Sequence, residues 1–84
     1  MDKVQFIKVK IPGLNVSHDF IVPRTMPVHE VTAMIVQLLH EEYPDAQKPS
    51  QPHALLQVAS GAALDSNGTL EQFDVYNGET FILL

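Results

Sequence analysis

Residues 69–84 read Thr69-Leu-Glu-Gln-Phe-Asp-Val-Tyr-Asn-Gly-Glu-Thr-Phe-Ile-Leu-Leu84. The beginning of this stretch, residues 69–73, predicts a single helical turn, because a threonine can cap the first turn of a helix. Asn77-Gly78 is a common turn dipeptide, and it is followed by a run of apolar residues. We therefore predict a final strand over Thr80–Leu84, with Phe81 and Leu83 facing the core.

The N-terminal part of the chain predicts a β-hairpin. Apolar residues at positions 7, 9 and 11 alternate with lysines at positions 8 and 10, the pattern of a half-buried strand. Pro12-Gly13-Leu14-Asn15 has the composition of a turn. A second alternating run follows, in which Phe20 and Val22 share one face and Asp19 and Ile21 share the other.

The apolar spacing then changes to that of a helix. Pro27 is accepted at a helix start, and Pro44 disfavours helical geometry in the residue before it, so we predict a helix from Pro27 to about Tyr43. Its inward face is predicted to contain Val28, Val31, Ile35, Leu38 and Leu39, widened by Met34.

Beyond a proline-rich loop over residues 44–53, three short elements are predicted before the C-terminal stretch. These are a strand over Ala54–Ala59 with Leu56 and Val58 facing the core, an edge strand over Ala62–Leu64, and a turn over Asp65–Gly68. The order is β-β-α-β-β-(short helical turn)-β. It predicts an α+β fold in which one main helix packs across a mixed sheet, forming a single domain over residues 1–84.

Composition excludes several classes of function. The 84 residues carry a formal net charge of −5, five Lys or Arg residues and no cysteine. Five cations are too few for a surface that neutralises several phosphates, so we predict no nucleic acid partner. No apolar run approaches the roughly 20 residues of a membrane helix, and no signal peptide begins the chain. We therefore expect a cytoplasmic protein without direct membrane insertion.

The strand and helix order, together with several short motifs, resembles the ubiquitin-like β-grasp fold. Leu64-Asp-Ser-Asn-Gly-Thr-Leu70 and Phe73-Asp-Val-Tyr-Asn-Gly-Glu-Thr-Phe-Ile-Leu83 resemble the C-terminal half of many ubiquitin-like domains. Ile21-Val-Pro-Arg-Thr-Met-Pro-Val28, the apolar helix from Val31 to Leu39 and the end Tyr76–Leu84 are similar to the YukD/EsaB family. These are small ubiquitin-like proteins of bacterial type VII (WXG-type) secretion systems. Residues 45–53 match no pattern of that family.

This resemblance implies an accessory or regulatory protein that binds membrane-embedded or ATPase subunits of a secretion machine. One alternative is a ubiquitin-like adaptor unrelated to secretion. The other is a sulfur carrier or protein modifier of the ubiquitin type. The modifier class needs a flexible Gly-Gly tail that an activating enzyme can thread. The given sequence ends on Leu84 in a predicted strand and contains no Gly-Gly, so the expectation is a protein that is not conjugated to targets.

Catalytic and metal sites are not indicated by the sequence. His29 and His40 share a helix face but lie about three turns, or roughly 16 Å, apart, too far to bind one ion. The glycines stand alone in turns and do not form a phosphate-binding loop. No nucleophile–base pair is suggested. We expect no enzymatic activity, no metal and no cofactor.

Two surfaces are candidates for binding a protein. The first is the helix face that carries His29, Ala33, Val36 and His40, where apolar residues take positions that a single-helix domain usually fills with charge. Ala33 and Val36 are either isolated exposed apolar residues, which are normal on a protein surface, or part of an interface with a partner or with a second copy in a homodimer. The second is the open sheet face, predicted to carry Lys8, Lys10, Leu55 and Gln57, with Ile82 as a possible addition.

Overall fold

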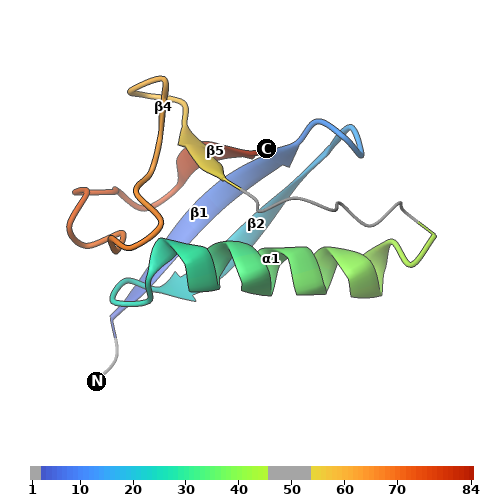
Figure 1. The fold of residues 1–84 in the computed structure, drawn as a ribbon, viewed down its shortest axis with the longest axis horizontal. Helices are drawn as coiled ribbons and strands as arrows, with labels where there is room; N and C mark the ends of the chain where they lie inside the picture. The colour runs from blue at the N-terminus through green and yellow to red at the C-terminus, as the bar shows by residue number, and fades with distance from the viewer. Residues whose placement is uncertain (1–2, 46–53) are drawn as a thin grey trace.

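The computed structural model describes residues 3–45 and 54–84, which form one five-stranded mixed sheet with a helix across one face (Figure 1). The strand order is β2-β1-β5-β3-β4. In chain order the elements are β1 (Val4–Ile11), β2 (Val16–Pro23), α1 (Val28–Glu42), β3 (Leu55–Gln57), β4 (Ala62–Ala63) and β5 (Glu79–Leu83). The predicted order of elements is therefore confirmed. Most of the predicted loop over residues 44–53 lies outside the described residues.

The N-terminal hairpin has the predicted alternation. β1 and β2 pair antiparallel from Val4 opposite Pro23 to Ile11 opposite Val16. Odd-numbered residues of β1 are buried against the helix and even-numbered residues are exposed. One sheet face is therefore the core face, and the other is open.

β5 is the central strand of the sheet. It pairs parallel with β1 and antiparallel with β3, and its burial alternates so that Phe81 and Leu83 face the core, as predicted. The Leu84 N–H donates to the carbonyl of Ala54 at 2.9 Å. Before β5, Thr69 forms an isolated bridge with Pro27, and residues 70–74 form successive turns where a single helical turn was predicted. The Gln72 N–H donates to Thr69 Oγ1, as expected of a capping threonine.

The start of α1 is held by a distant loop. Pro27 is the N-cap residue and has no side-chain cap hydrogen bond. Instead, the Val28 N–H donates to the Gly68 carbonyl at 2.8 Å and the His29 N–H to the Ser66 carbonyl at 3.0 Å. These bonds satisfy two of the N–H groups that a helix N-terminus leaves without intrahelical partners.

Gly68 has no room for a side chain. A Cβ added there would lie 2.6 Å from two ring carbons of Phe73, which packs against the core, whereas one added at Gly13 meets nothing within 4 Å. We expect Gly68→Ala to lower the free energy of unfolding by about 1–3 kcal/mol, as overpacking typically does. Gly13→Ala should stay within about 0.5 kcal/mol of the natural protein. Urea unfolding followed by circular dichroism measures both, and equal stabilities would contradict this packing.

The inward face of α1 differs from the prediction at two positions. Leu38 was expected in the core but is 42% exposed, whereas Thr32, which was not predicted to face inward, is buried beside Leu39. Thr32 is buried because its hydroxyl donates to the His29 carbonyl at 2.9 Å, which satisfies its polar group within the helix. The buried face is therefore rotated slightly away from Leu38, and it contains Val28, Val31, Thr32, Ile35 and Leu39.

The prediction for β3 was wrong by one residue. Leu56 and Val58 were expected to face the core, but Leu55 is fully buried and Val58 is 48% exposed. Leu55 lies opposite buried Leu83, so pairing with β5 places it on the core side and turns Leu56 outward. Val58 lies in the turn after this three-residue strand.

Candidate protein-binding surfaces

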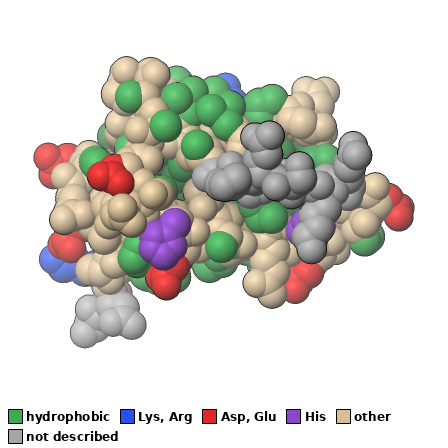
Figure 2. All heavy atoms as spheres, in the orientation of Figure 1, with side chains coloured by type: hydrophobic (Ala, Val, Ile, Leu, Met, Phe, Trp, Pro, Cys, Tyr) green, Lys and Arg blue, Asp and Glu red, His purple; other side chains and the backbone are tan. Residues whose placement is uncertain are grey.

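The predicted helix face lies on one side of α1. His29 and Ala33 are exposed, while Val36 and His40 are half-buried. Val36 packs against the core cluster, so it offers only part of its side chain to a partner. In Figure 2, hydrophobic side chains over α1 are scattered among histidine and acidic residues in the area that the undescribed residues leave visible. This face therefore presents little apolar area.

The open face of the sheet presents more apolar area. We call it the outer sheet surface and define it by the outward side chains of Val4, Phe6, Lys8, Lys10, Ile21, Leu56 and Ile82. Val4 is 56% exposed, Phe6 39% and Ile21 67%. Phe6 and Ile21 are direct cross-strand partners, so their side chains lie next to each other. A second apolar area is formed by Leu56 opposite Ile82.

Two residues predicted for this surface lie on the other side of the sheet. Leu55 is buried in the core, and Gln57 points the same way because the two are separated by one residue in β3. The Gln57 Nε2 donates to Glu79 Oε2 at 2.5 Å, and Glu79 is 2% exposed. Gln57 is thus the partner of a buried carboxylate. Lys8, Lys10 and Ile82 do lie on the outer sheet surface, as predicted.

The charges of the chain are distributed unevenly. Residues 3–24 carry four cations, Lys3, Lys8, Lys10 and Arg24, against a single carboxylate, Asp19. Over residues 25–45 and 54–84 there are eight carboxylates and no lysine or arginine. Lys8 lies opposite Asp19 in the register of β1 and β2, and Lys3 Nζ lies 3.7 Å from Glu71 Oε1. Lys10 is opposite Ser17 and Ile82, so it is the cation of the outer sheet surface with no carboxylate directly across from it.

The backbone of Phe6 is fixed by hydrogen bonds to the Asn77-Gly78 turn. Its N–H donates to Asn77 Oδ1 at 3.1 Å, and its carbonyl accepts the Gly78 N–H at 2.7 Å. The same Asn77 oxygen accepts from Nε2 of buried Gln5 at 3.3 Å. The Asn77-Gly78 turn therefore fixes the strand that carries Phe6. A backbone that is already fixed loses little conformational freedom on binding, which favours this surface for protein contacts.

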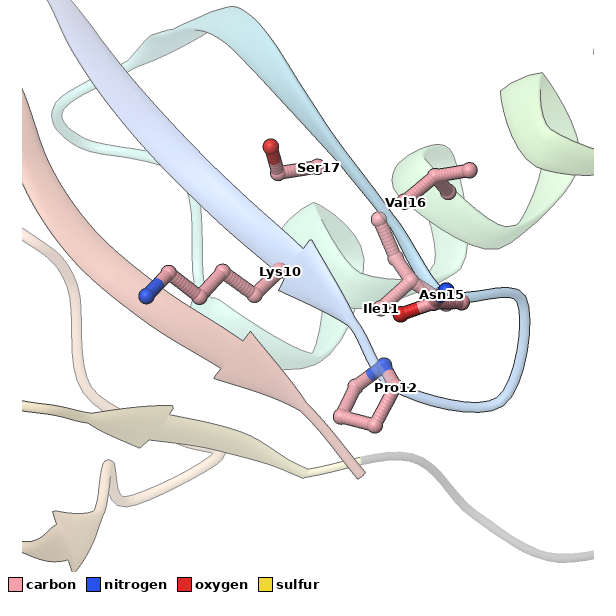
Figure 3. A pocket seen from close by; sticks show the side chains of 6 residues that line it. All are labelled: Lys10, Ile11, Pro12, Asn15, Val16 and Ser17. Carbon is pink, nitrogen blue, oxygen red and sulfur yellow. The ribbon is translucent and has the colours of Figure 1, made fainter.

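A hollow of about 370 Å³ lies at the tip of the hairpin and is open to solvent (Figure 3). It is lined by the end of β1, the turn and the start of β2, at Lys10, Ile11, Pro12, Asn15, Val16 and Ser17. The Lys10 side chain extends away from the turn and across β5 (Figure 3). A single hairpin supplies all of these groups. They do not converge on one point from several elements, as the polar groups of a small-molecule site do.

Neither a metal site nor a membrane-spanning helix is indicated in the part of the chain that the structure describes. Over residues 3–45 and 54–84, no group of three or more His, Cys, Asp or Glu side chains is arranged to hold a metal ion. The helix in these same ranges falls short of the length and apolar character needed to cross a membrane.

Some residues of the outer sheet surface could be predicted from the sequence, and others could not. Strand alternation alone places Val4 and Phe6 on the same face as Lys8 and Lys10. The position of Ile21 beside Phe6 depends on the hairpin register, because a shift of one residue would turn it to the core face. The position of Ile21 next to Phe6 could therefore not be predicted from the sequence alone.

Comparison with known proteins gives one family and a set of structural relatives. The family model described as "WXG100 protein secretion system (Wss), protein YukD" matches residues 6–83. The EccD5 ubiquitin-like domain from Mycobacterium xenopi is 14% identical, with a TM-score of 0.79 over 98% of this chain and 93% of that one. The ubiquitin-like domain of the Mycobacterium tuberculosis type VII secretion protein ECCD1 is 15% identical, with a TM-score of 0.76 and 98% coverage of both chains.

A chain of the MycP5-free ESX-5 inner membrane complex is also similar, at 20% identity and a TM-score of 0.80. The match covers 96% of the present chain and 20% of that chain. These likenesses establish the ubiquitin-like fold. Comparison with the curated proteins finds no significant match.

Proposed function

The chain belongs to the YukD family of the WXG100 protein secretion system, and from that membership we propose that it is a non-catalytic component that binds other proteins of the secretion machine. Its partners are membrane or ATPase subunits, and it meets them from the cytoplasm. A chain in the ESX-5 inner membrane complex contains a region of the same fold, which supports a partner of this kind.

The observation that carries this proposal is the outer sheet surface. It combines exposed apolar side chains, with Phe6 beside Ile21, and the cations Lys8 and Lys10. Aromatic residues in the middle of an interface commonly supply much of its binding energy, while charges at the rim set specificity and association rate. The complementary partner surface is apolar with an acidic rim. We rank this surface above the helix face, because Ala33 and half-buried Val36 offer less apolar area.

The test is binding of the purified chain to the cytosolic parts of the membrane and ATPase subunits from the same secretion locus, measured by calorimetry. Phe6→Asp and Lys10→Glu should each weaken binding, the first by about 30-fold or more, the size of a hot-spot loss. Ala33→Glu is the matched control, because it adds a charge to an exposed position of the helix face. Each variant's stability is checked by urea unfolding.

Three outcomes distinguish the possibilities. Loss with Phe6→Asp and retention with Ala33→Glu supports the outer sheet surface. The opposite pattern assigns binding to the helix face that contains His29, Ala33, Val36 and His40. No binding to any subunit contradicts the secretion-machine partner and favours an adaptor unrelated to secretion.

We also propose that binding is non-covalent. Residues 79–83 lie in the central strand of the sheet, with Phe81 and Leu83 buried, and the Leu84 N–H is bonded to Ala54. Segments paired in this way are not free to be threaded into an activating enzyme. Mass spectrometry of the chain recovered with its partners should therefore give the unmodified mass, and a conjugate or thiocarboxylate would overturn this part of the proposal.

A further inference from the structure

Among the residues that the structure describes, one edge of the sheet is a long strand with no further strand beside it. β2 is an outermost strand of eight residues, whereas the strand at the opposite edge, β4, has two. The Arg24 N–H donates to the Lys3 carbonyl, which marks that pair as hydrogen-bonded. Because such pairs alternate along an antiparallel ladder, the backbone groups of residues 16, 18, 20 and 22 face β1. Those of Ser17, Asp19 and Ile21 face away from the sheet, where no described strand pairs with them.

Apolar side chains flank this edge on both faces. Ile21, on the outer side, is 67% exposed, the largest fraction among the exposed large hydrophobic residues of the described chain. On the core side, Val16 and Phe20 are only half-buried, and among the described residues no further strand lies beyond β2. A long edge that combines unpaired backbone groups with exposed apolar residues favours pairing with another strand.

We propose that β2 pairs antiparallel with β2 of a second copy of this chain, about a two-fold axis at Phe20. The outward backbone groups belong to odd-numbered residues, so hydrogen-bonded pairs must join odd with odd. With the axis at Phe20, Asp19 pairs with Ile21 of the second copy, and Ser17 pairs with Pro23. Phe20 then lies opposite its own copy at a non-hydrogen-bonded position, where side chains approach most closely.

Neighbouring registers are less favourable. An axis at Asp19 would place two carboxylates directly opposite each other, which is destabilising. An axis at His18 would leave only residues 16–20 of each β2 paired with each other, because the strand begins at Val16. The Phe20 register pairs residues 17–23 and opposes no like charges. Pro23 lacks an N–H, but its carbonyl can still accept the Ser17 N–H.

A second copy fits this edge for two reasons. The register about Phe20 is self-complementary, and the two-residue β4 offers no comparable edge on which a chain of copies could continue. A pairing that uses the same edge from both copies closes on itself as a two-fold dimer. The outer sheet surface stays open across the resulting ten-stranded sheet, so this inference does not rest on the proposed function.

The solution mass tests the dimer directly. Sedimentation equilibrium of the natural chain should give twice the 9.3 kDa chain mass at high concentration and dissociate on dilution. Ile21→Asp should reduce the mass to that of one chain, because in the Phe20 register it places a second carboxylate directly opposite Asp19 of the other copy. Val58→Asp, which makes the same kind of change at another exposed apolar residue, should leave it unchanged. A mass of one chain at every concentration overturns the proposal. It does so even if a strand of another protein is found to bind β2.

Disulfide trapping tests the register, because the chain contains no cysteine and each introduced thiol is unique. Phe20→Cys should form a disulfide-linked dimer faster than Ile21→Cys, although Ile21 is the more exposed position. Random collision would give the reverse order, and fastest trapping with Asp19→Cys would place the axis elsewhere; either result overturns the Phe20 register. Circular dichroism confirms that each variant folds. If Phe20→Cys does not fold, the mass measurements with Ile21→Asp and Val58→Asp still decide the proposal.

Discussion

Leu55→Asp should unfold the domain, whereas Leu56→Asp should leave it folded. Leu55 is fully buried opposite Leu83, and its burial contributes about 1.5–3 kcal/mol. An aspartate there would also place an unpaired charge in the core, at a cost of several kcal/mol. A chain of 84 residues has a total stability of about 4–13 kcal/mol at the usual stability per residue, so this loss is comparable to the whole.

Leu56 is the matched control, because it is the next residue of the same strand and receives the same substitution. It is half-exposed on the outer sheet surface, so its replacement should cost about 1 kcal/mol. Circular dichroism and urea unfolding measure both variants. If Leu56→Asp unfolds the protein while Leu55→Asp does not, the register of β3 against β5 is wrong by one residue.

This pair of residues also shows where sequence reasoning reaches its limit. Residues 54–59 are apolar except for Gln57, so they predict a strand but do not determine which alternate residues face the core. The residues of β3 that face the core are determined by the pairing of Leu55 with Leu83, which lies far away in the chain. β1, in contrast, alternates with lysines, and its core face was predicted correctly. When a strand has polar residues on one face, its sequence shows which face is turned to the core; a uniformly apolar strand does not show this.

The helix shows a related limit. Leu38 and Leu39 are adjacent, and hydrophobicity alone assigned both to the core. Thr32 competes for the same face, because its hydroxyl is satisfied within the helix and can be buried at little cost. The hydrogen bonds from Val28 and His29 to the loop at 66–68 are likewise invisible in a local pattern. The helix bounds were predictable, since Pro27 and Pro44 mark them in the sequence.

The candidate surfaces were only partly predictable for the same reason. The helix face was placed correctly on one side of α1, but the partial burial of Val36 depends on how closely the helix approaches the sheet. Lys8 and Lys10 were assigned to the open sheet face from alternation alone. The apolar pair of Phe6 and Ile21 beside them requires the hairpin register, which a single sequence leaves open.

Phe81→Ala should remove most of the stability of the domain. Phe81 is fully buried in the central strand, between Val9 of β1 and Gln57 of β3. Truncating a buried phenylalanine costs about 3–5 kcal/mol, since it loses burial and leaves a cavity. This loss is a large part of the stability usual for a chain of this length, so we expect a large fall in the urea concentration at the midpoint of unfolding. The slope of the free energy of unfolding against urea concentration should stay unchanged, because the surface exposed on unfolding stays similar.

Phe20→Ala is the control with identical chemistry at the edge of the same sheet. Phe20 is half-buried, so its truncation removes fewer contacts and opens no enclosed cavity, and its effect should be less than half that of Phe81→Ala. The comparison is made on dilute protein, where association through β2 does not add to the stability of either variant. Equal losses in the free energy of unfolding at both positions would mean that Phe20 at the edge is as enclosed as Phe81 at the centre of the sheet. That result would contradict the strand order, and with it the open edge at β2 on which dimer formation depends.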